Sequence, residues 1–296
     1  MKKTVFTGSG TAIITPMRED LSVNYEKLGE LLDFQLAGGS DAIVICGTTG
    51  EASTTSDEEH IGLIRYTVDR VKGRVPVVAG VGSNDTRYAI WLSKEAAQAG
   101  ADALLHVTPY YNKTSQAGLV RHFSAVADAT DLPVILYNVP SRTGLNISPE
   151  TYLKLSEHPN IVATKEANGN ISEIARTASL CGDNLAIYSG NDDQIVPLMS
   201  LGAIGVISVL SNVMPRETHD MCRLYLEGDA RGSAALQLRL LDLINALFID
   251  VNPIPVKAAL NLMGFAVGEC RLPLAPLGDG ALVTLKAAMK KHGLAG

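Results

Sequence analysis

The sequence lacks the signatures of several common protein classes. It has no Gly-x-x-x-x-Gly-Lys segment, and the glycine pairs at residues 8–10 and 80–82 lack the third glycine of a dinucleotide-binding turn. Its four cysteines form no Cys-x-x-Cys pair, and a chain of 296 residues can build a core without disulfides, so we expect reduced thiols. Nothing here indicates a phosphate-binding or redox protein.

Excess basic charge and long apolar runs are also missing. The formal net charge is −6, which provides no basic surface for nucleic acid. No apolar run reaches the roughly 20 residues that span a membrane, and the segment after Lys2 and Lys3 is too polar for a signal peptide. With 46% hydrophobic and 19% charged residues, the chain is predicted to be globular and cytoplasmic, with no membrane or nucleic-acid partner.

Short apolar runs recur along the chain, each followed by a polar turn and an amphipathic segment of helical length. Almost continuous hydrophobicity is typical of parallel strands buried on both faces. The eight runs are residues 12–15, 42–46, 75–81, 103–107, 133–139, 161–164, 185–190 and 204–209. Eight strand–helix units favour an α/β fold, the (β/α)8 TIM barrel, over an open doubly wound sheet.

Helix signals between and after the runs complete this organisation. Ser56 and Glu59 have capping-box spacing, and Ser148 precedes a proline at the first helical position. The strand runs stop near residue 225, and residues 233–248 and 256–268 are predicted to be helical. We therefore expect a barrel over residues 1–225 and a helical region over residues 226–296 packed on it.

Barrel enzymes build their sites at the carboxyl ends of the strands. The segments at those ends are GTTGE (47–51), TPYYNK (108–113), YNVPSRTG (137–144), KEANGN (165–170) and SGNDD (189–193). In the first segment, backbone N–H groups between Gly47 and Gly50 can hold a carboxylate.

Lys165 directly follows the sixth apolar run. Such a lysine either has a structural role, in which it reaches the rim or pairs with Glu166, or acts as a nucleophile. Burial favours the neutral amine, and only the neutral amine attacks a ketone or aldehyde to form a Schiff base. The second interpretation predicts a site for amine attack on a carbonyl.

Schiff-base chemistry also needs groups that move protons and bind the substrate. Tyr137 is either a core tyrosine or part of a hydroxyl relay, to which Thr48 and Tyr111 can contribute. The pair formed by Thr48 and Thr49 also fits an ordinary turn. Arg142 is either a solvated loop residue or a clamp for a carboxylate, which suits an acidic substrate.

The segments GTTGE, YNVPSRTG and KEANGN, in this order and at these strand ends, resemble the pyruvate-dependent class I aldolase superfamily and, within it, the dihydrodipicolinate synthase family. The similarity extends from residues 10–16 to the C-terminal helices. The sialic-acid lyases of the superfamily share the turn, the tyrosine and the lysine, but they lack an arginine at the place of Arg142. That arginine and KEANGN favour the synthase family.

The resemblance implies a lyase that condenses pyruvate with L-aspartate 4-semialdehyde to 4-hydroxy-tetrahydrodipicolinate, in the diaminopimelate route to lysine, without a cofactor or metal. It implies that Lys165 forms the Schiff base and that Tyr137 donates and accepts protons. Thr48 would link Tyr137 to Tyr111, which the family inserts from a neighbouring subunit. A homo-oligomer follows, as a tight dimer or a tetramer of two dimers.

Substrate binding is also implied by the resemblance. Thr49 and the main chain near Gly190 and Ile207 would hold pyruvate. Arg142 would bind the carboxylate of the aldehyde. A sialic-acid or keto-deoxy sugar acid lyase of the same superfamily remains an alternative for the activity.

A possible effector site departs from the family pattern. Family members inhibited by lysine carry a polar patch near the GTTGE turn, which Asn84 and Tyr110 match and His60 matches in part. Three positions differ: Ala52 replaces a serine, Asp57 a histidine and Tyr88 a glutamate. Since a lost charge partner costs about 2 kcal/mol or more of effector affinity, we expect weak or absent lysine feedback.

Two further alternatives belong to other classes. A metal-dependent aldolase would need several His or carboxylate ligands at the strand ends, whereas five of the six histidines fall in predicted helices, at their ends or in the tail. His106 lies within a strand, where a core position is expected. A non-catalytic keto-acid-binding protein is the other alternative, because a fold does not fix a function.

Overall fold

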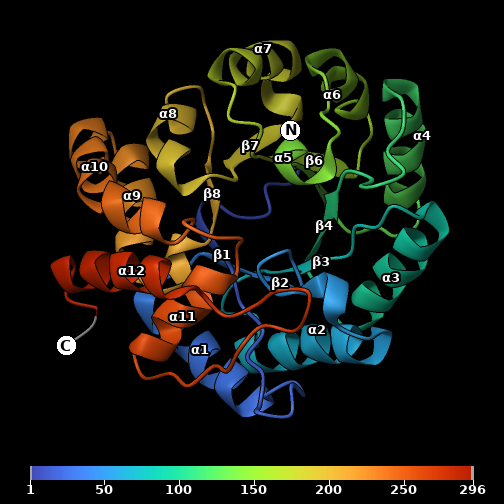
Figure 1. The fold of residues 1–296 in the computed structure, drawn as a ribbon. Helices are drawn as coiled ribbons and strands as arrows, with labels where there is room; N and C mark the ends of the chain where they lie inside the picture. The colour runs from blue at the N-terminus through green and yellow to red at the C-terminus, as the bar shows by residue number, and fades with distance from the viewer. Residues whose placement is uncertain (1, 295–296) are drawn as a thin grey trace.

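The computed structural model describes residues 2–294, in which eight parallel strands close into a barrel (Figure 1). Each strand is hydrogen-bonded to the next, and β1 pairs with β8. The strands are β1 (Gly8–Ala12), β2 (Ala42–Ile45), β3 (Val77–Gly80), β4 (Ala103–Val107), β5 (Val134–Asn138), β6 (Ile161–Glu166), β7 (Ala186–Ser189) and β8 (Gly205–Ser208). The predicted TIM barrel is confirmed.

Helices surround the barrel, and the predicted caps begin two of them. Ser56 and Glu59 form the capping box of α2, and Ser148 caps α6 with Pro149 in its first turn. The helices up to β8 are α1 (Tyr25–Gly38), α2 (Asp57–Val71), α3 (Thr86–Gln98), α4 (Gln116–Ala127), α5 (Pro140–Thr143), α6 (Pro149–Leu155), α7 (Ile171–Cys181) and α8 (Ile195–Met199). The short α5 lies at the strand ends, where it presents Arg142.

The first strand differs from its prediction, because β1 spans Gly8–Ala12 and not residues 12–15. Small residues build it. Gly10 faces the ring of Phe6 so closely that a Cβ atom would lie 2.6 Å from a ring carbon. Thr11 faces α1 and donates a hydrogen bond to Gln35 at 2.7 Å. Because β1 packs against the Phe6 ring and against α1, it consists of small and polar residues. These residues do not form an apolar run, so the sequence does not reveal the strand.

An aromatic pair closes the amino-terminal end of the barrel. Phe6, which precedes β1, stacks on Tyr188 of β7 with ring centroids 4.3 Å apart. The Tyr188 hydroxyl donates to the carbonyl oxygen of Phe6 at 2.6 Å. Both rings belong to the apolar cluster that fills the barrel interior. We call this pair the barrel floor.

An irregularity in β6 sets the register of the sheet near the candidate site. Val134 pairs with Ile161, but three residues later Tyr137 pairs with Lys165, so one extra residue of β6 is accommodated between them. Without this bulge Tyr137 would lie opposite Thr164, and Lys165 would turn to the other face. The bulge therefore places the lysine on the face of the tyrosine.

The helix that follows β8 is α9 (Pro215–Leu226). The C-terminal region contains α10 (Ala230–Ala246), α11 (Ile254–Leu262) and α12 (Asp279–Lys291), and these helices lie with α9 on one side of the barrel (Figure 1). The expectation that residues 256–268 are helical is wrong beyond Leu262. Gly264, Ala266 and Gly268 adopt left-handed φ angles, which end the helix. The division into two parts at residue 225 stays a prediction.

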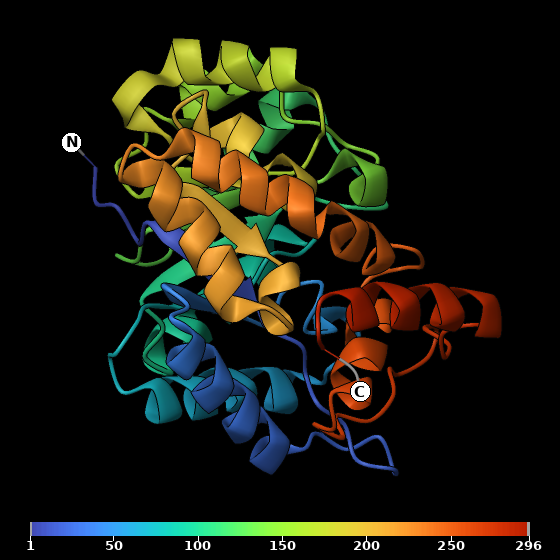
Figure 2. The ribbon, with the colours of Figure 1, turned by 90° about the vertical axis from the view of Figure 1, so that its left-hand side faces the viewer.

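A buried ion pair fastens this region to the GTTGE turn. The Lys257 ammonium of α11 donates to Glu51 at 2.8 Å and to the carbonyl of Glu269 at 2.6 Å. The two paired side chains are 2% and 1% exposed. The main-chain N–H of Arg271 donates to the second Glu51 oxygen at 2.9 Å. In Figure 2, α11 and α12 lie together at one end of the barrel, and these contacts hold α11 there.

Other sequence expectations concern cysteines and membranes. The four cysteines are free, and Cys46, Cys181 and Cys222 are buried, as expected. Within residues 2–294, every helix is too short or too polar to cross a membrane.

Replacing Lys257 by methionine should lower the free energy of unfolding by about 3–5 kcal/mol, because the Glu51 carboxylate would stay buried without its cation. Urea denaturation at a fixed protein concentration measures this change. The matched control is Lys27→Met, which breaks an exposed pair with Glu30 and should cost less than about 0.5 kcal/mol. Equal midpoints for the two variants would contradict the role of the buried pair.

Candidate functional site

Lys165 and Tyr137 lie side by side at the carboxyl ends of β6 and β5. The Lys165 side chain is 5% exposed, and its Nζ atom lies 4.3 Å from the centroid of the Tyr137 ring. Tyr137 is also buried and belongs to the interior cluster. The structure thus brings an amine and a phenol together inside the barrel, near the edge where the strands end.

The interpretation that Lys165 pairs with Glu166 is wrong. Successive strand residues face opposite sides, and Glu166 points outward, where it accepts hydrogen bonds from Asn138, from the Tyr152 hydroxyl at 2.8 Å and from the N–H of Asn168 at 2.9 Å. Burial raises the pKa of the Glu166 carboxyl to about 7, although these donors oppose the shift. Glu166 therefore joins the ends of β5 and β6 and leaves the lysine amine without its carboxylate.

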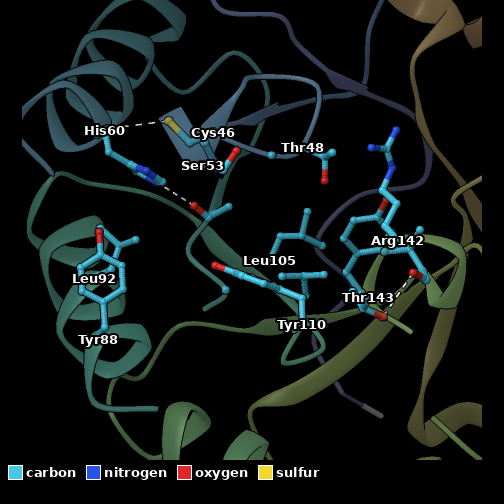
Figure 3. A pocket seen from close by; sticks show the side chains of 17 residues that line it. Cys46, Thr48, Ser53, His60, Tyr88, Leu92, Leu105, Tyr110, Arg142 and Thr143 are labelled. Carbon is cyan, nitrogen blue, oxygen red and sulfur yellow. Dashed lines mark hydrogen bonds between the residues drawn. The ribbon is translucent and has the colours of Figure 1, made fainter. Parts of the chain in front are cut away.

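A cavity of about 300 Å³ opens beside these residues. Thr48, Tyr137 and Arg142 line it together, whereas Lys165 and Thr49 are not among its lining residues. Figure 3 shows Thr48 and Arg142 at one end of the cavity and His60, Tyr88 and Leu92 at the other. The exposed Arg142 guanidinium is held by one hydrogen bond, to the carbonyl of Asn252 at 3.3 Å.

The GTTGE turn uses some of its N–H groups internally. Those of Gly50 and Glu51 donate to the carbonyls of Gly47 and Thr48 at 3.0 and 3.1 Å. Among residues 2–294, the N–H groups of Thr48 and Thr49 have no protein acceptor. The N–H groups of the two threonines between Gly47 and Gly50 therefore remain available for the predicted binding of a carboxylate.

The two main-chain positions that were predicted to hold pyruvate, Gly190 and Ile207, lie just after β7 and in β8. The N–H of Gly190, just after β7, donates to the carbonyl of Glu166 at 2.8 Å, and a Cβ atom there would lie 2.8 Å from that of Ala167. Ile207 is fully buried in β8, where it pairs with Gly10. Only glycine fits at position 190, because the backbone passes so close to the end of β6.

The predicted relay is not assembled within one chain. Tyr111 is 91% exposed and does not line the cavity, and it adopts a left-handed φ of 65°. Among the described residues, no hydrogen bond joins Thr48 to Tyr137 or to Tyr111. The Tyr111 side chain thus points into solvent, and the site of a single chain contains only two of the three hydroxyl groups of the predicted relay.

Two of the three possible effector residues, His60 and Tyr110, line the cavity. His60 is buried and bonded to the carbonyl of Gly80 at 2.8 Å, and burial lowers the pKa of its imidazole. Figure 3 shows Tyr110 nearer the middle of the cavity, while Asn84 does not line it and accepts a hydrogen bond from Asn112 through its carbonyl.

Two residues that depart from the family pattern contact each other there. The Tyr88 hydroxyl donates to the Asp57 carboxylate at 2.5 Å. Burial and this bond raise the pKa of Tyr88 above its usual value. The two side chains therefore satisfy each other at the place where an inhibitor's charges would need partners.

Two buried polar residues near the site were not predicted. Asn252, in the loop before α11, donates to the Thr49 hydroxyl at 2.9 Å. Asp192, in the SGNDD segment, accepts from the N–H groups of Val209 and Leu210 at 3.0 and 2.9 Å. Burial raises the pKa of the Asp192 carboxyl, although its hydrogen bonds and the nearby Lys165 oppose this. The Asn-Pro pair at 252–253 was a turn signal, which indicates no site.

The arrangement suits chemistry on a carbonyl compound that carries a carboxylate. A buried amine can attack the carbonyl, a phenol and a threonine hydroxyl can transfer protons, and a guanidinium with free N–H groups can bind carboxylates. Within residues 2–294, no group of three or more His, Cys, Asp or Glu side chains is placed to hold a metal ion. His106 is buried in β4 and contacts Ser93 of α3, as expected for a core histidine.

Comparison with known proteins gives consistent results over nearly the whole chain. A 4-hydroxy-tetrahydrodipicolinate synthase of Lachnoclostridium phytofermentans is 60% identical, over 98% of this chain and 99% of that protein. The crystal structure of the chloride-inhibited dihydrodipicolinate synthase from Acinetobacter baumannii complexed with pyruvate matches with a TM-score of 0.96 and 43% identity, over 98% of this chain and 100% of that one.

A second solved structure, of a monomeric dihydrodipicolinate synthase variant, matches with a TM-score of 0.96 and 42% identity, over 98% of each chain. The model of the Dihydrodipicolinate synthetase family matches residues 5–292, which include every strand of the barrel and the helices from α9 to α12. With family-wide similarity over that span and the amine, phenol and guanidinium at the expected strand ends, this chain belongs to the dihydrodipicolinate synthetase family.

Proposed function

We propose that this chain is a lyase that condenses pyruvate with L-aspartate 4-semialdehyde to give 4-hydroxy-tetrahydrodipicolinate. The observation that carries the proposal is the Lys165 amine, buried beside Tyr137 at the mouth of the barrel. The names of the similar proteins support the same activity. The product belongs to the diaminopimelate route to lysine, and such biosynthesis fits a cytoplasmic enzyme.

In the proposed reaction, the neutral Lys165 amine attacks the keto carbon of pyruvate, and the resulting carbinolamine loses water to form an imine. Tyr137 supplies the proton that leaves with this water and recovers one when the pyruvate methyl group is deprotonated to the enamine. The enamine carbon then attacks the aldehyde carbon, which restores the imine, and Tyr137 protonates the resulting alkoxide to the hydroxyl group of the product. Finally, the amino group of the second substrate attacks the imine carbon, closes the ring and releases Lys165.

The remaining site residues bind the two acids. The Thr49 hydroxyl and the main chain near Gly190 and Ile207 hold the pyruvate carboxylate. Arg142, at the mouth of the cavity, binds the carboxylate of the aldehyde through its charged N–H groups. This order places the smaller substrate inside and the larger one at the entrance.

We also propose a homo-oligomer in which Tyr111 enters the site of a neighbouring subunit and joins Thr48 and Tyr137. Its support is that Tyr111 is 91% exposed and adopts a left-handed φ of 65°, a strained conformation for a non-glycine residue that is typical of functional sites. The smallest assembly that completes the relay is a dimer, and two dimers would make a tetramer.

Borohydride reduction in the presence of pyruvate should attach a reduced pyruvate group to Lys165, because hydride traps an imine as a stable amine. Peptide mass spectrometry locates the modification. Lys257 is an internal control, since it is equally buried but paired with Glu51, and its peptide should stay unmodified. Lys165→Ala should lose both the adduct and the activity. An unmodified Lys165 peptide would refute Schiff-base catalysis and would favour a protein that only binds keto acids.

Replacing Tyr111 by phenylalanine should lower kcat about 100-fold or more while changing the KM values little, because it removes one hydroxyl of the proton relay. Steady-state kinetics of the intact oligomer measures this. Tyr225→Phe, on α9 and outside the site, provides the matched control and should keep the parent rate. A Tyr111→Phe variant as fast as this control would argue against a relay shared between subunits.

Lysine should inhibit weakly or not at all, because Asp57 and Tyr88 are hydrogen-bonded to each other and the Ala52 side chain has no polar atom. Initial rates measured against lysine concentration test this. Tyr88→Glu, which restores a carboxylate at that position, should increase the sensitivity to lysine. Half-inhibition of the parent enzyme at sub-millimolar lysine would contradict the expectation.

A further inference from the structure

The C-terminal region places one side chain, Asn252, against two groups of the proposed site. Asn252 lies in the loop between α10 and α11, yet it is only 6% exposed. Its side-chain Nδ2 donates to the Thr49 hydroxyl at 2.9 Å, and its main-chain carbonyl accepts from Arg142 at 3.3 Å. One residue thus contacts both groups that are proposed to bind substrate carboxylates.

The direction of the first hydrogen bond decides what Thr49 can do. A hydroxyl that accepts a hydrogen bond keeps its own proton free to donate elsewhere. Since the Asn252 amide donates to Thr49, the Thr49 proton is available for a carboxylate.

The opposite orientation of the amide is less favourable. As it stands, Oδ1 of Asn252 is buried without a partner among the described residues. Turning the amide around would give that oxygen the Thr49 proton and would leave the NH2 group buried without an acceptor. Proteins tolerate an unpaired carbonyl oxygen more readily than an unpaired N–H, so the donor orientation is favoured.

We propose that Asn252 is a positioning residue, which makes the Thr49 hydroxyl a donor to the pyruvate carboxylate while its main chain holds Arg142 at the mouth. The proposal rests on the roles assigned to Thr49 and Arg142 in the proposed function. It gives the C-terminal region a part in substrate binding, because that region supplies the group that orients a residue of the GTTGE turn.

Steady-state kinetics of two variants distinguishes orientation from mere packing. The carboxylate in Asn252→Asp keeps the shape but can only accept, so the Thr49 proton should turn toward it. We expect the KM for pyruvate to rise about tenfold or more, with a much smaller change in kcat. Asn252→Ala offers no competing acceptor and should raise this KM less. The KM for the aldehyde should change less in both, since the main-chain carbonyl that holds Arg142 remains.

A double variant tests whether the effect passes through Thr49. Thr49→Val alone should raise the KM for pyruvate about tenfold, and adding Asn252→Asp to it should produce little further increase. Asn261→Asp is the matched control, because this asparagine also lies in the C-terminal region and donates to a main-chain carbonyl, that of Gly268 at 3.0 Å. It should leave both KM values unchanged.

The proposal is overturned if Asn252→Ala raises the KM for pyruvate as much as Asn252→Asp does, or if Asn252→Asp keeps its full effect beside Thr49→Val. If neither Asn252 variant folds, a Thr49→Val enzyme with the parent KM for pyruvate overturns it instead. Borohydride trapping separates this result from the activity itself. An adduct on Lys165 of the parent with no change of KM in Asn252→Asp refutes the positioning role alone, whereas no adduct on the parent refutes the proposed function.

Discussion

The structure depends on where the β6 backbone places one amine. A single extra residue in β6, relative to β5, puts Lys165 opposite Tyr137 instead of Thr164. The same shift turns Glu166 outward, into hydrogen bonds with Asn138 and Tyr152, and so keeps a carboxylate away from the amine. An ammonium paired with a carboxylate would stay charged and could not attack a carbonyl. The register of two strands therefore decides whether the proposed chemistry is possible.

The C-terminal region is part of this arrangement. Its Lys257 pairs with Glu51 in the interior, and its Asn252 contacts Thr49, so two residues of one short turn are fixed by one loop and one helix. The main-chain carbonyl of Asn252 also accepts a hydrogen bond from Arg142. A turn rich in glycine and threonine would otherwise have many conformations of similar energy. The added helices thus provide rigidity at the place where the two substrate carboxylates are proposed to bind.

The sequence predicted the barrel, and it identified most residues of the proposed site, because these features leave local patterns. Seven of the strands are apolar runs, and polar residues at their carboxyl ends include Thr48, Tyr137, Arg142 and Lys165. It failed where distant contacts decide. The first strand consists of small residues chosen by the Phe6 ring, and the bulge in β6 has no signature in the sequence. Asn252 resembled an ordinary turn residue, because its partners lie far away in the chain.

The barrel floor affects how substrates enter the site and how the product leaves it. Phe6 and Tyr188 fill the amino-terminal end of the interior, so molecules can reach the site only from the carboxyl ends of the strands, where the cavity lies. Molecules must come and go through the same opening. A molecule that bound first at the mouth would block access to the Lys165 amine. In the proposed reaction, the architecture therefore imposes an order of binding. The keto acid binds first, the aldehyde binds second, and no further substrate enters until the cyclic product has left.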